Sequence, residues 1–266
     1  MQRLFRFTHI NKRFFSSSPA ATPDTLSKFM RANQLLASNN EPRTMLQLMK
    51  EAAEEGNSDA QVTLAHLLLN GHAPASLAPD ANEAFKWTLR SGESGNIGAQ
   101  CRLAVMCASG VGTQPSETSA FEWTRRAAEN TANSPEAMAA LGVLYYQGRG
   151  VTQNLSEAFV WTKKAADAGL LEAQSLVGDM FYHGLGTDVD MPKAFEYTKL
   201  AANQGHVFSQ LKISSMYLMG DGVKSDVDLA KEWAKKATGE EIDFVNPGQW
   251  LHDQMEKLME AEVEGR

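Results

Sequence analysis

Apolar residues recur along the chain at the spacing of amphipathic helices. Within residues 134–169, a first apolar stripe has the i, i+4, i+7, i+8 spacing of a helix that faces a core, at Ala137, Leu141, Leu144 and Tyr145. A second helix follows with apolar residues on two adjacent faces, Ala158, Trp161 and Ala165 on one and Phe159, Thr162 and Ala166 on the next. No stretch clearly alternates apolar and polar residues, so the pattern predicts an all-α protein.

Two glycines separate these predicted helices. Gly148 can end the first helix because glycine adopts the left-handed conformation at little cost, and Gly150 lets the chain reverse in a tight loop. Asn154 or Ser156 can cap the second helix by accepting a hydrogen bond from a free amide of its first turn. The result is a helical hairpin whose second helix has more apolar surface than its partner helix can cover.

The hairpin is repeated at a nearly fixed interval. The large aromatic residue of the second helix recurs 36, 38, 36 and 36 residues apart, at Trp87, Trp123, Trp161, Tyr197 and Trp233. Glycine pairs begin 13 residues before the last four of these aromatics, at Gly110 and Gly112, Gly148 and Gly150, Gly184 and Gly186, and Gly220 and Gly222. We interpret all of these residues as structural, because stacked copies of a hairpin bury the faces that a single copy leaves open.

The letters of the unit resemble a known repeat. The pattern A-x-x-x-L-G-x-x-Y-x-x-G-x-G-V at 137–151, followed by E-A-F-x-W-x-x-K-A-A-x-x-G at 157–169, is similar to the Sel-1-like repeat family, a relative of the tetratricopeptide repeat with a longer loop. The resemblance covers about residues 41–240. It implies a right-handed superhelical α-solenoid of about five antiparallel helix-hairpin repeats, each of 36 to 38 residues, with terminal capping helices. The tetratricopeptide period of about 34 residues fits the interval less well.

The chain is expected to have four segments. They are a mitochondrial transit peptide at 1–18, a linker and N-terminal capping helix at 19–40, the repeat solenoid at 41–245, and a C-terminal capping helix at 246–266. Repeats are expected at about 57–95, 96–132, 133–169, 170–205 and 206–241, after a half-unit helix at 43–55. Two departures stand out: the first repeat has the insert Ala73–Pro79 in place of a short glycine loop, and Lys231 replaces the Phe of the other repeats.

The N-terminal segment has its own composition. Residues 1–23 are rich in serine at 16–18 and hold four basic residues and no acidic residue. Such a composition is typical of a mitochondrial transit peptide, and R-F-F-S-S at 13–17 resembles a matrix processing signal that places cleavage near Phe15. The alternative is a disordered basic tail. We expect a mitochondrial protein of the matrix, because no apolar sorting segment follows.

The remaining chain is acidic. Without the four N-terminal basic residues, 21 basic residues face 32 acidic residues, which gives a net charge of −11. An acidic array binds a phosphate backbone poorly, so an organellar RNA-binding repeat protein is the less favoured alternative. No apolar stretch approaches the roughly 18 residues of a membrane-spanning helix, so we expect no membrane span.

The sequence has no catalytic or metal-binding pattern. Cys101 and Cys107 lie about 240° apart around one predicted helix and cannot bridge each other, and Cys107 occupies a core position that is aromatic in other repeats. The histidines lack metal-ligand spacing, and the glycine loops lack the strand and third glycine of a dinucleotide site. We expect no enzyme, no cofactor and no metal. The alternative is a small-molecule hydrolase of the bacterial cysteine-rich repeat type, whose paired cysteines are missing here.

The remaining candidates lie on the predicted surface. In the resembled family the first helix of each repeat lines the concave side, so its non-core positions form the expected contact row. Between repeats these positions differ in charge and polarity, at Thr63, His66, Arg102, Val105, Leu176, Asp179, Lys212 and Ser215. The preferred partner-binding residues are Arg102, Val105, Tyr146, Asp179, Tyr182 and Lys212, with both tyrosines exposed; the alternative is ordinary solvated surface. Together these features predict a non-enzymatic protein–protein interaction scaffold or adaptor in mitochondria, an assembly factor or accessory subunit whose partners are proteins.

Overall fold

The computed structural model describes residues 22–38, 40–130 and 134–239. Over these ranges the chain has twelve α-helices, one 3₁₀ helix and no named β-strand. It forms two units, Met1–Ala132 and Asn133–Arg266. The expected transit peptide at 1–18 and the expected capping helix at 246–266 lie outside the described residues.

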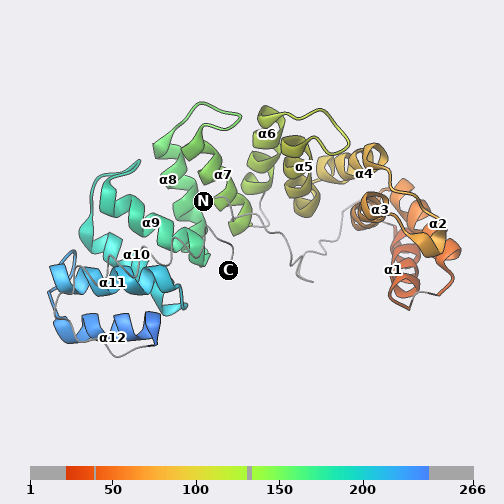
Figure 1. Cartoon of the computed structure of the whole chain (residues 1–266). Coiled ribbons are helices and arrows are strands. Elements are labelled where there is room, and N and C mark those ends of the chain that lie inside the picture. The colour runs from red at the N-terminus through yellow and green to blue at the C-terminus, as the bar shows by residue number, and fades with distance from the viewer. Residues whose placement is uncertain (1–21, 39, 131–133, 240–266) are drawn as a thin grey trace. The chain divides into compact units, whose positions relative to one another are not determined.

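Unit 1 is built from three helical hairpins (Figure 1). Their helices are α1 (Pro23–Ser38) with α2 (Pro42–Glu54), α3 (Ser58–Asn70) with α4 (Ala81–Glu93), and α5 (Ile97–Ser109) with α6 (Glu117–Glu129). The first helix of one hairpin also packs against the second helix of the hairpin before it, α3 against α2 and α5 against α4.

Unit 2 repeats this arrangement. Its hairpins are α7 (Pro135–Gln147) with α8 (Leu155–Asp167), α9 (Leu171–His183) with α10 (Met191–Asn203), and α11 (Val207–Met219) with α12 (Val227–Thr238). Here too α9 packs against α8 and α11 packs against α10. The predicted all-α fold of repeated helix pairs is therefore confirmed.

Side-chain caps start the second helix of each repeat. The side chain before the helix accepts a hydrogen bond from an amide of the first turn in every case, at Asp80, Ser116, Asn154, Asp190 and Asp226. Of the two predicted caps of α8, Asn154 takes this role. Each cap also donates its own backbone N–H to the first helix, to the carbonyl groups of Leu68, Cys107, Tyr145, Phe181 and Tyr217, respectively. The cap therefore closes the loop as well as starting the helix.

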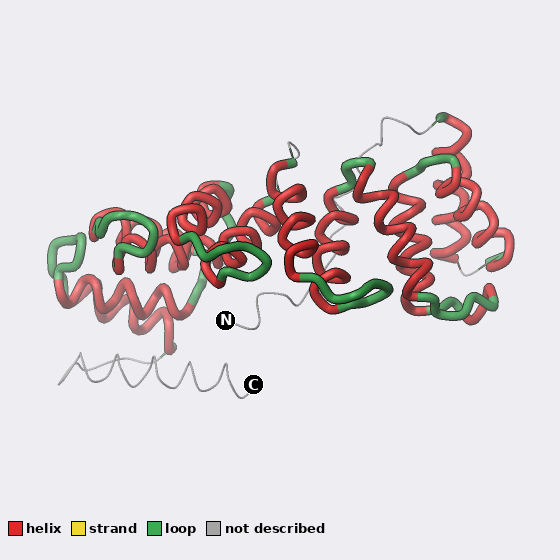
Figure 2. Tube along the Cα trace, turned by 90° about the horizontal axis from the view of Figure 1, so that it is seen from above, coloured by secondary structure: helices red, strands yellow, loops and turns green. Residues whose placement is uncertain are grey.

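The loops between the paired helices are drawn in green in Figure 2. The first glycine of each predicted pair ends its helix in the left-handed conformation, with φ of 72° at Gly110 and 80° at Gly220. In the first repeat the insert forms a short 3₁₀ helix, Ala73–Ala75, and a bridge between His72 and Leu77. The Asp80 N–H still bonds to the Leu68 carbonyl at 2.8 Å, so the insert leaves the closing hydrogen bond intact.

The repeated aromatic residues fill the space between neighbouring helices. Trp87 and Trp233 are buried, and Trp123, Trp161 and Tyr197 are half-buried. The tryptophans carry a cation three residues later over the ring, Arg90, Arg126, Lys164 and Lys236, at 3.8–4.7 Å from the ring centroid. A cation at this place shields the outer face of the ring while its charge stays in water.

Buried glutamines join one hairpin to the next. The fourth residue of the first helix is glutamine in four repeats, Gln61, Gln100, Gln174 and Gln210. Its amide nitrogen donates to the backbone carbonyl eight residues earlier, on Ala53, Gly92, Ala166 and Ala202, respectively. That carbonyl belongs to the last turn of the second helix of the preceding hairpin, so the hydrogen bond links each hairpin to the one before it. In α7 the corresponding residue is Met138.

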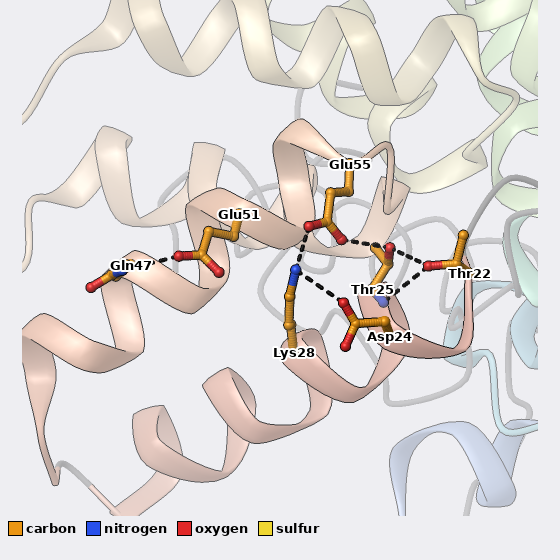
Figure 3. Close-up of polar contacts among 7 residues, drawn as sticks. All are labelled: Thr22, Asp24, Thr25, Lys28, Gln47, Glu51 and Glu55. Carbon is orange, nitrogen blue, oxygen red and sulfur yellow. Dashed lines mark hydrogen bonds and ion pairs between the residues drawn. The ribbon is translucent and has the colours of Figure 1, made fainter.

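The first hairpin is held by a polar cluster between its two helices (Figure 3). Lys28 of α1 forms ion pairs with Asp24 and Glu55, and Thr25 donates a hydrogen bond to the Glu55 carboxylate at 2.7 Å. Hydrogen bonds from Lys28 and Thr25 lower the pKa of Glu55. The sequence predicted α2 as the single helix of an incomplete repeat. In the structure it pairs with α1 to form a complete helical hairpin.

Candidate interaction surface

The predicted contact row lies on the first helices of the repeats, and its residues differ in surroundings. Val105 of α5 is 46% exposed. Arg102, Tyr146, Asp179, Tyr182 and Lys212 are half-buried. Both tyrosines are therefore more covered than the sequence predicted.

In unit 2 the structure brings three of the predicted residues together. Lys212 of α11 forms an ion pair with Asp179 of α9, and its ammonium nitrogen lies 4.6 Å from the centroid of the Tyr182 ring. The Tyr182 hydroxyl donates to Asp221 at 2.8 Å, a contact that the sequence analysis missed. This hydrogen bond, together with burial, raises the pKa of Tyr182. The four groups satisfy one another and connect the second hairpin of the unit to the third.

In unit 1 the matching positions hold two basic residues. Arg102 is the sixth residue of α5, as Lys212 is of α11, and His66 is the ninth residue of α3, as Asp179 is of α9. Burial lowers the pKa of Arg102. Burial and the charge of Arg102 lower the pKa of His66. The carboxylate that Asp179 provides at the ninth position in unit 2 is thus replaced by an imidazole in unit 1.

Tyr146 lies near the end of α7, one turn beyond Val143. Its backbone carbonyl accepts a hydrogen bond from Gln153 at 2.7 Å, which ties the end of the helix to the following loop. Tyr146 lies in the first helix of its repeat, and its place in a partner-binding row stays a prediction.

A pocket of about 420 Å³ in unit 2 is lined by residues of α8, α9 and α10 and of the loop after α9. Three aromatic rings line it, with Phe159 and Phe181 edge to face at 5.0 Å and Phe181 and Tyr197 stacked at 5.8 Å. Its two lysines are already paired, Lys163 with Asp167 at 2.6 Å and Lys193 with Asp190 at 2.7 Å. The apolar spacing in the sequence predicted structural positions for Phe159 and Tyr197 and gave no sign of this pocket.

The groups considered for chemistry are scattered. In the described ranges, no three His, Cys, Asp or Glu side chains are grouped so that they could hold a metal ion. Cys101 is half-buried and Cys107 is buried, and neither forms a disulfide bond in the described residues. Burial raises the pKa of the Cys107 thiol, which matches its predicted place in the core. None of the described helices is both long and apolar enough to cross a membrane.

Comparisons with known proteins agree with this architecture. The Sel1 repeat family model matches five segments of the chain, residues 58–96, 97–131, 135–170, 171–206 and 207–238. These lie within a few residues of the predicted repeats, and the α1–α2 hairpin precedes all of them. No curated protein matches the chain.

Two solved structures are similar to the chain. The first is c5321, described as a protective antigen present in uropathogenic Escherichia coli strains displaying an SLR fold, with a TM-score of 0.71 and 24% identity over 81% of this chain and 46% of that chain. The second is a Sel1 repeat protein from Oxalobacter formigenes, with a TM-score of 0.63 and 26% identity over 86% of this chain and 65% of that chain. The chain therefore spans less than two thirds of either protein, and the first likeness concerns the fold alone.

Proposed function

The chain belongs to the Sel1 repeat family, and from that premise we propose that it is a non-enzymatic protein-interaction scaffold or adaptor of mitochondria. Proteins built from Sel1 repeats are generally protein-interaction scaffolds. The proposed role of this chain is that of an assembly factor or accessory subunit of a larger complex. Its partners are proteins that dock on the first helices of the repeats.

One observation carries the proposal: the repeats share their core residues and differ in the row beside it. The structural positions hold the same kinds of residue from repeat to repeat, as the buried glutamines and the partly exposed capping residues show. The sixth and ninth residues of the first helices change instead from Thr63 and His66 to Arg102 and Val105, and from Leu176 and Asp179 to Lys212 and Ser215. A stack needs only the shared residues, so the variable row is the part that can recognise a partner.

The location in mitochondria is proposed from the N-terminal sequence. The segment 1–18 is basic, rich in serine and free of acidic residues, which is the composition of a transit peptide. The test is to express the full chain and a variant lacking residues 1–18, each with a C-terminal tag, and to measure protease-protected protein in purified mitochondria. We expect protease-protected protein from the full chain and none from the variant that lacks residues 1–18. Equal import of both chains would contradict the transit peptide.

The scaffold role is tested by affinity purification of the tagged full chain from mitochondria, followed by mass spectrometry. The same purification is repeated with the double variant D179K/K212D. This variant exchanges the two charges of a pair on the contact row and preserves the ion pair itself, so the fold is kept while the surface charge pattern changes. A defined set of proteins is expected with the wild-type chain, and part of that set should be lost with the charge-exchanged chain. Recovery of bulk matrix proteins only, together with turnover of a β-lactam or salt-sensitive RNA retention by the purified chain, would overturn the proposal.

A further inference from the structure

Arg102 is a half-buried cation for which the described part of the chain offers no partner. Within residues 22–38, 40–130 and 134–239, no ion pair or hydrogen bond involves its guanidinium group. Two other cations of unit 1 have acidic partners: Arg125 bonds to Glu122 and Glu129, and Lys28 to Asp24 and Glu55. Withdrawing a guanidinium from water without a compensating acceptor is costly, so the site favours an acceptor from outside the chain.

Unit 2 shows what fits at this place. The sixth residue of α11, Lys212, is bound by the carboxylate of Asp179, the ninth residue of the preceding first helix. In unit 1 the ninth residue is His66, which has no acidic group to offer Arg102. In unit 2 the repeat geometry thus brings the Asp179 carboxylate to Lys212. In unit 1 the equivalent residue, Arg102, has no such carboxylate in the described part of the chain.

We propose that Arg102, together with His66 and Val105, forms a docking site for an acidic segment of a partner protein, in which a Glu or Asp side chain binds the Arg102 guanidinium. A guanidinium pairs with a carboxylate through two parallel hydrogen bonds, which gives the contact both strength and direction. This site deepens the proposed scaffold function and rests on it.

The neighbours of Arg102 suit such a segment. His66 is the ninth residue of the preceding first helix, and its ring can donate an N–H to an acidic segment. Val105 follows Arg102 by three residues, so it lies on the same side of α5, and its 46% exposure offers an apolar contact beside the charge. An acidic residue next to an aliphatic one is therefore the expected core of the partner segment.

The test uses the purified full chain and a synthetic probe, an acetylated peptide of repeated Glu-Glu-Leu-Gly blocks, with a Gln-Gln-Leu-Gly peptide as its uncharged counterpart. The readouts are peptide fluorescence anisotropy and the NMR resonance of the Arg102 side-chain Nε–H group. The acidic peptide should shift that resonance in a saturable, salt-sensitive way. The affinity should fall about tenfold or more in R102Q and less in R102K, which keeps the charge.

R125Q is the matched control, because Arg125 belongs to the same unit and already has two acidic partners. It should bind the acidic peptide as the wild-type chain does, and the helical circular dichroism of all variants should agree. Equal binding of the Glu and Gln peptides, or unchanged affinity in R102Q, would overturn the site. Binding that develops only after Glu260, Glu262 and Glu264 are replaced by Gln would assign the site to the chain's own C-terminal stretch and would also overturn it.

The failure of this site and the failure of the scaffold function give different results. If the wild-type chain and R102Q recover the same mitochondrial proteins, the scaffold function holds and the Arg102 site is wrong. If neither chain recovers a specific set, the scaffold function is wrong, and the peptide titration still decides whether Arg102 binds carboxylates.

Discussion

Gly222 lies directly against the backbone carbonyl group of Met191: a Cβ atom added to Gly222 would be 2.0 Å from that oxygen. Gly112 and Gly186 meet the carbonyl groups of Ala81 and Leu155 at the same distance. The second glycine of these loops therefore holds the loop of one repeat against the first residue of the preceding repeat's second helix. The sequence suggested that this glycine allows a tight chain reversal, and the structure adds a close contact between neighbouring repeats.

Replacing Gly222 by alanine should destabilise the protein much more than replacing Gly220. Both residues have positive φ, 69° at Gly222 and 80° at Gly220, so alanine is strained at either position. At Gly220, however, the nearest atom to an added Cβ is 3.6 Å away. We expect a loss of about 1 kcal/mol in the free energy of unfolding for G220A and about 3 kcal/mol or more for G222A, because only the second adds a steric clash. Urea unfolding of both variants measures the difference, and equal losses would show that the contact between repeats has no energetic role.

Arg102→Leu should stabilise the protein. The substitution removes a half-buried charge that has no partner in the described part of the chain and keeps most of the apolar volume. We expect a gain of about 1 kcal/mol in the free energy of unfolding, at the expense of partner binding. The equivalent change in unit 2, Lys212→Leu, should instead cost about 0.5–1 kcal/mol, because it leaves Asp179 unpaired. Thermal and urea unfolding of the two variants should therefore move in opposite directions, and a loss of stability in both would contradict the view of Arg102 as unpaired.

Arg102 should also control the titration of His66. Burial and the nearby Arg102 charge hold the pKa of His66 below its usual 6.5 in the folded chain. The unfolded chain then binds the proton at higher pH, so this contribution to stability is present above about pH 6.5 and is lost as the pH falls through the folded pKa. In R102L the pKa of His66 should rise toward its usual value, and the acid-induced loss of stability should shrink. An NMR titration of the His66 ring protons checks this, with H66Q to assign the signal; an unchanged pKa would show that the two groups are not coupled.

The attachment of α1 to α2 should weaken in acid. Hydrogen bonds from Lys28 and Thr25 lower the pKa of Glu55 below 4.5, so the unfolded carboxylate takes up its proton at higher pH than the folded one. The stabilisation is complete above about pH 4.5 and is lost as the pH falls through the folded pKa. The protection factors of the α1 amides, which are the exchange rates corrected for the intrinsic pH dependence of exchange, should fall over this range in the wild-type chain. In E55Q these protection factors should already be low at neutral pH and should change little with acid, and an unaltered pH profile of protection in this variant would rule out the Glu55 contact as the cause.

Features that depend on short stretches of sequence could be predicted, and features that depend on pairing between repeats could not. The helix pairs, the Asn154 cap and the burial of Cys107 all follow from the local spacing of apolar, glycine and capping residues. The contact between Tyr182 and Asp221 joins residues 39 positions apart, and no local pattern reveals it. The α1 helix also lacks the repeat motif, so its pairing with α2 becomes visible only from the side chains around Glu55.

The buried glutamines provide a last test of how the hairpins are joined, because two of them differ in one hydrogen bond. Gln100 donates to the Gly92 carbonyl at 3.1 Å, and its own side-chain oxygen has no hydrogen-bond partner in the described structure. Gln174 donates to the Ala166 carbonyl at 3.3 Å and also accepts a hydrogen bond from Gln204 at 2.7 Å.

Methionine occupies this position in α7, as Met138, so the same residue is a natural replacement in the other repeats. Gln100→Met removes one hydrogen bond and an unpaired buried oxygen, two effects of opposite sign, and should change the free energy of unfolding by less than about 1 kcal/mol. Gln174→Met removes two hydrogen bonds and leaves the exposed Gln204 amide with only its long hydrogen bond to the Gly169 carbonyl at 3.5 Å, so it should cost about 2 kcal/mol. Urea unfolding of the two variants, with Gln204→Ala in both backgrounds, separates the contributions. If Gln100→Met proved the more harmful change, the joint would depend on the shape of the glutamine side chain rather than on its hydrogen bonds.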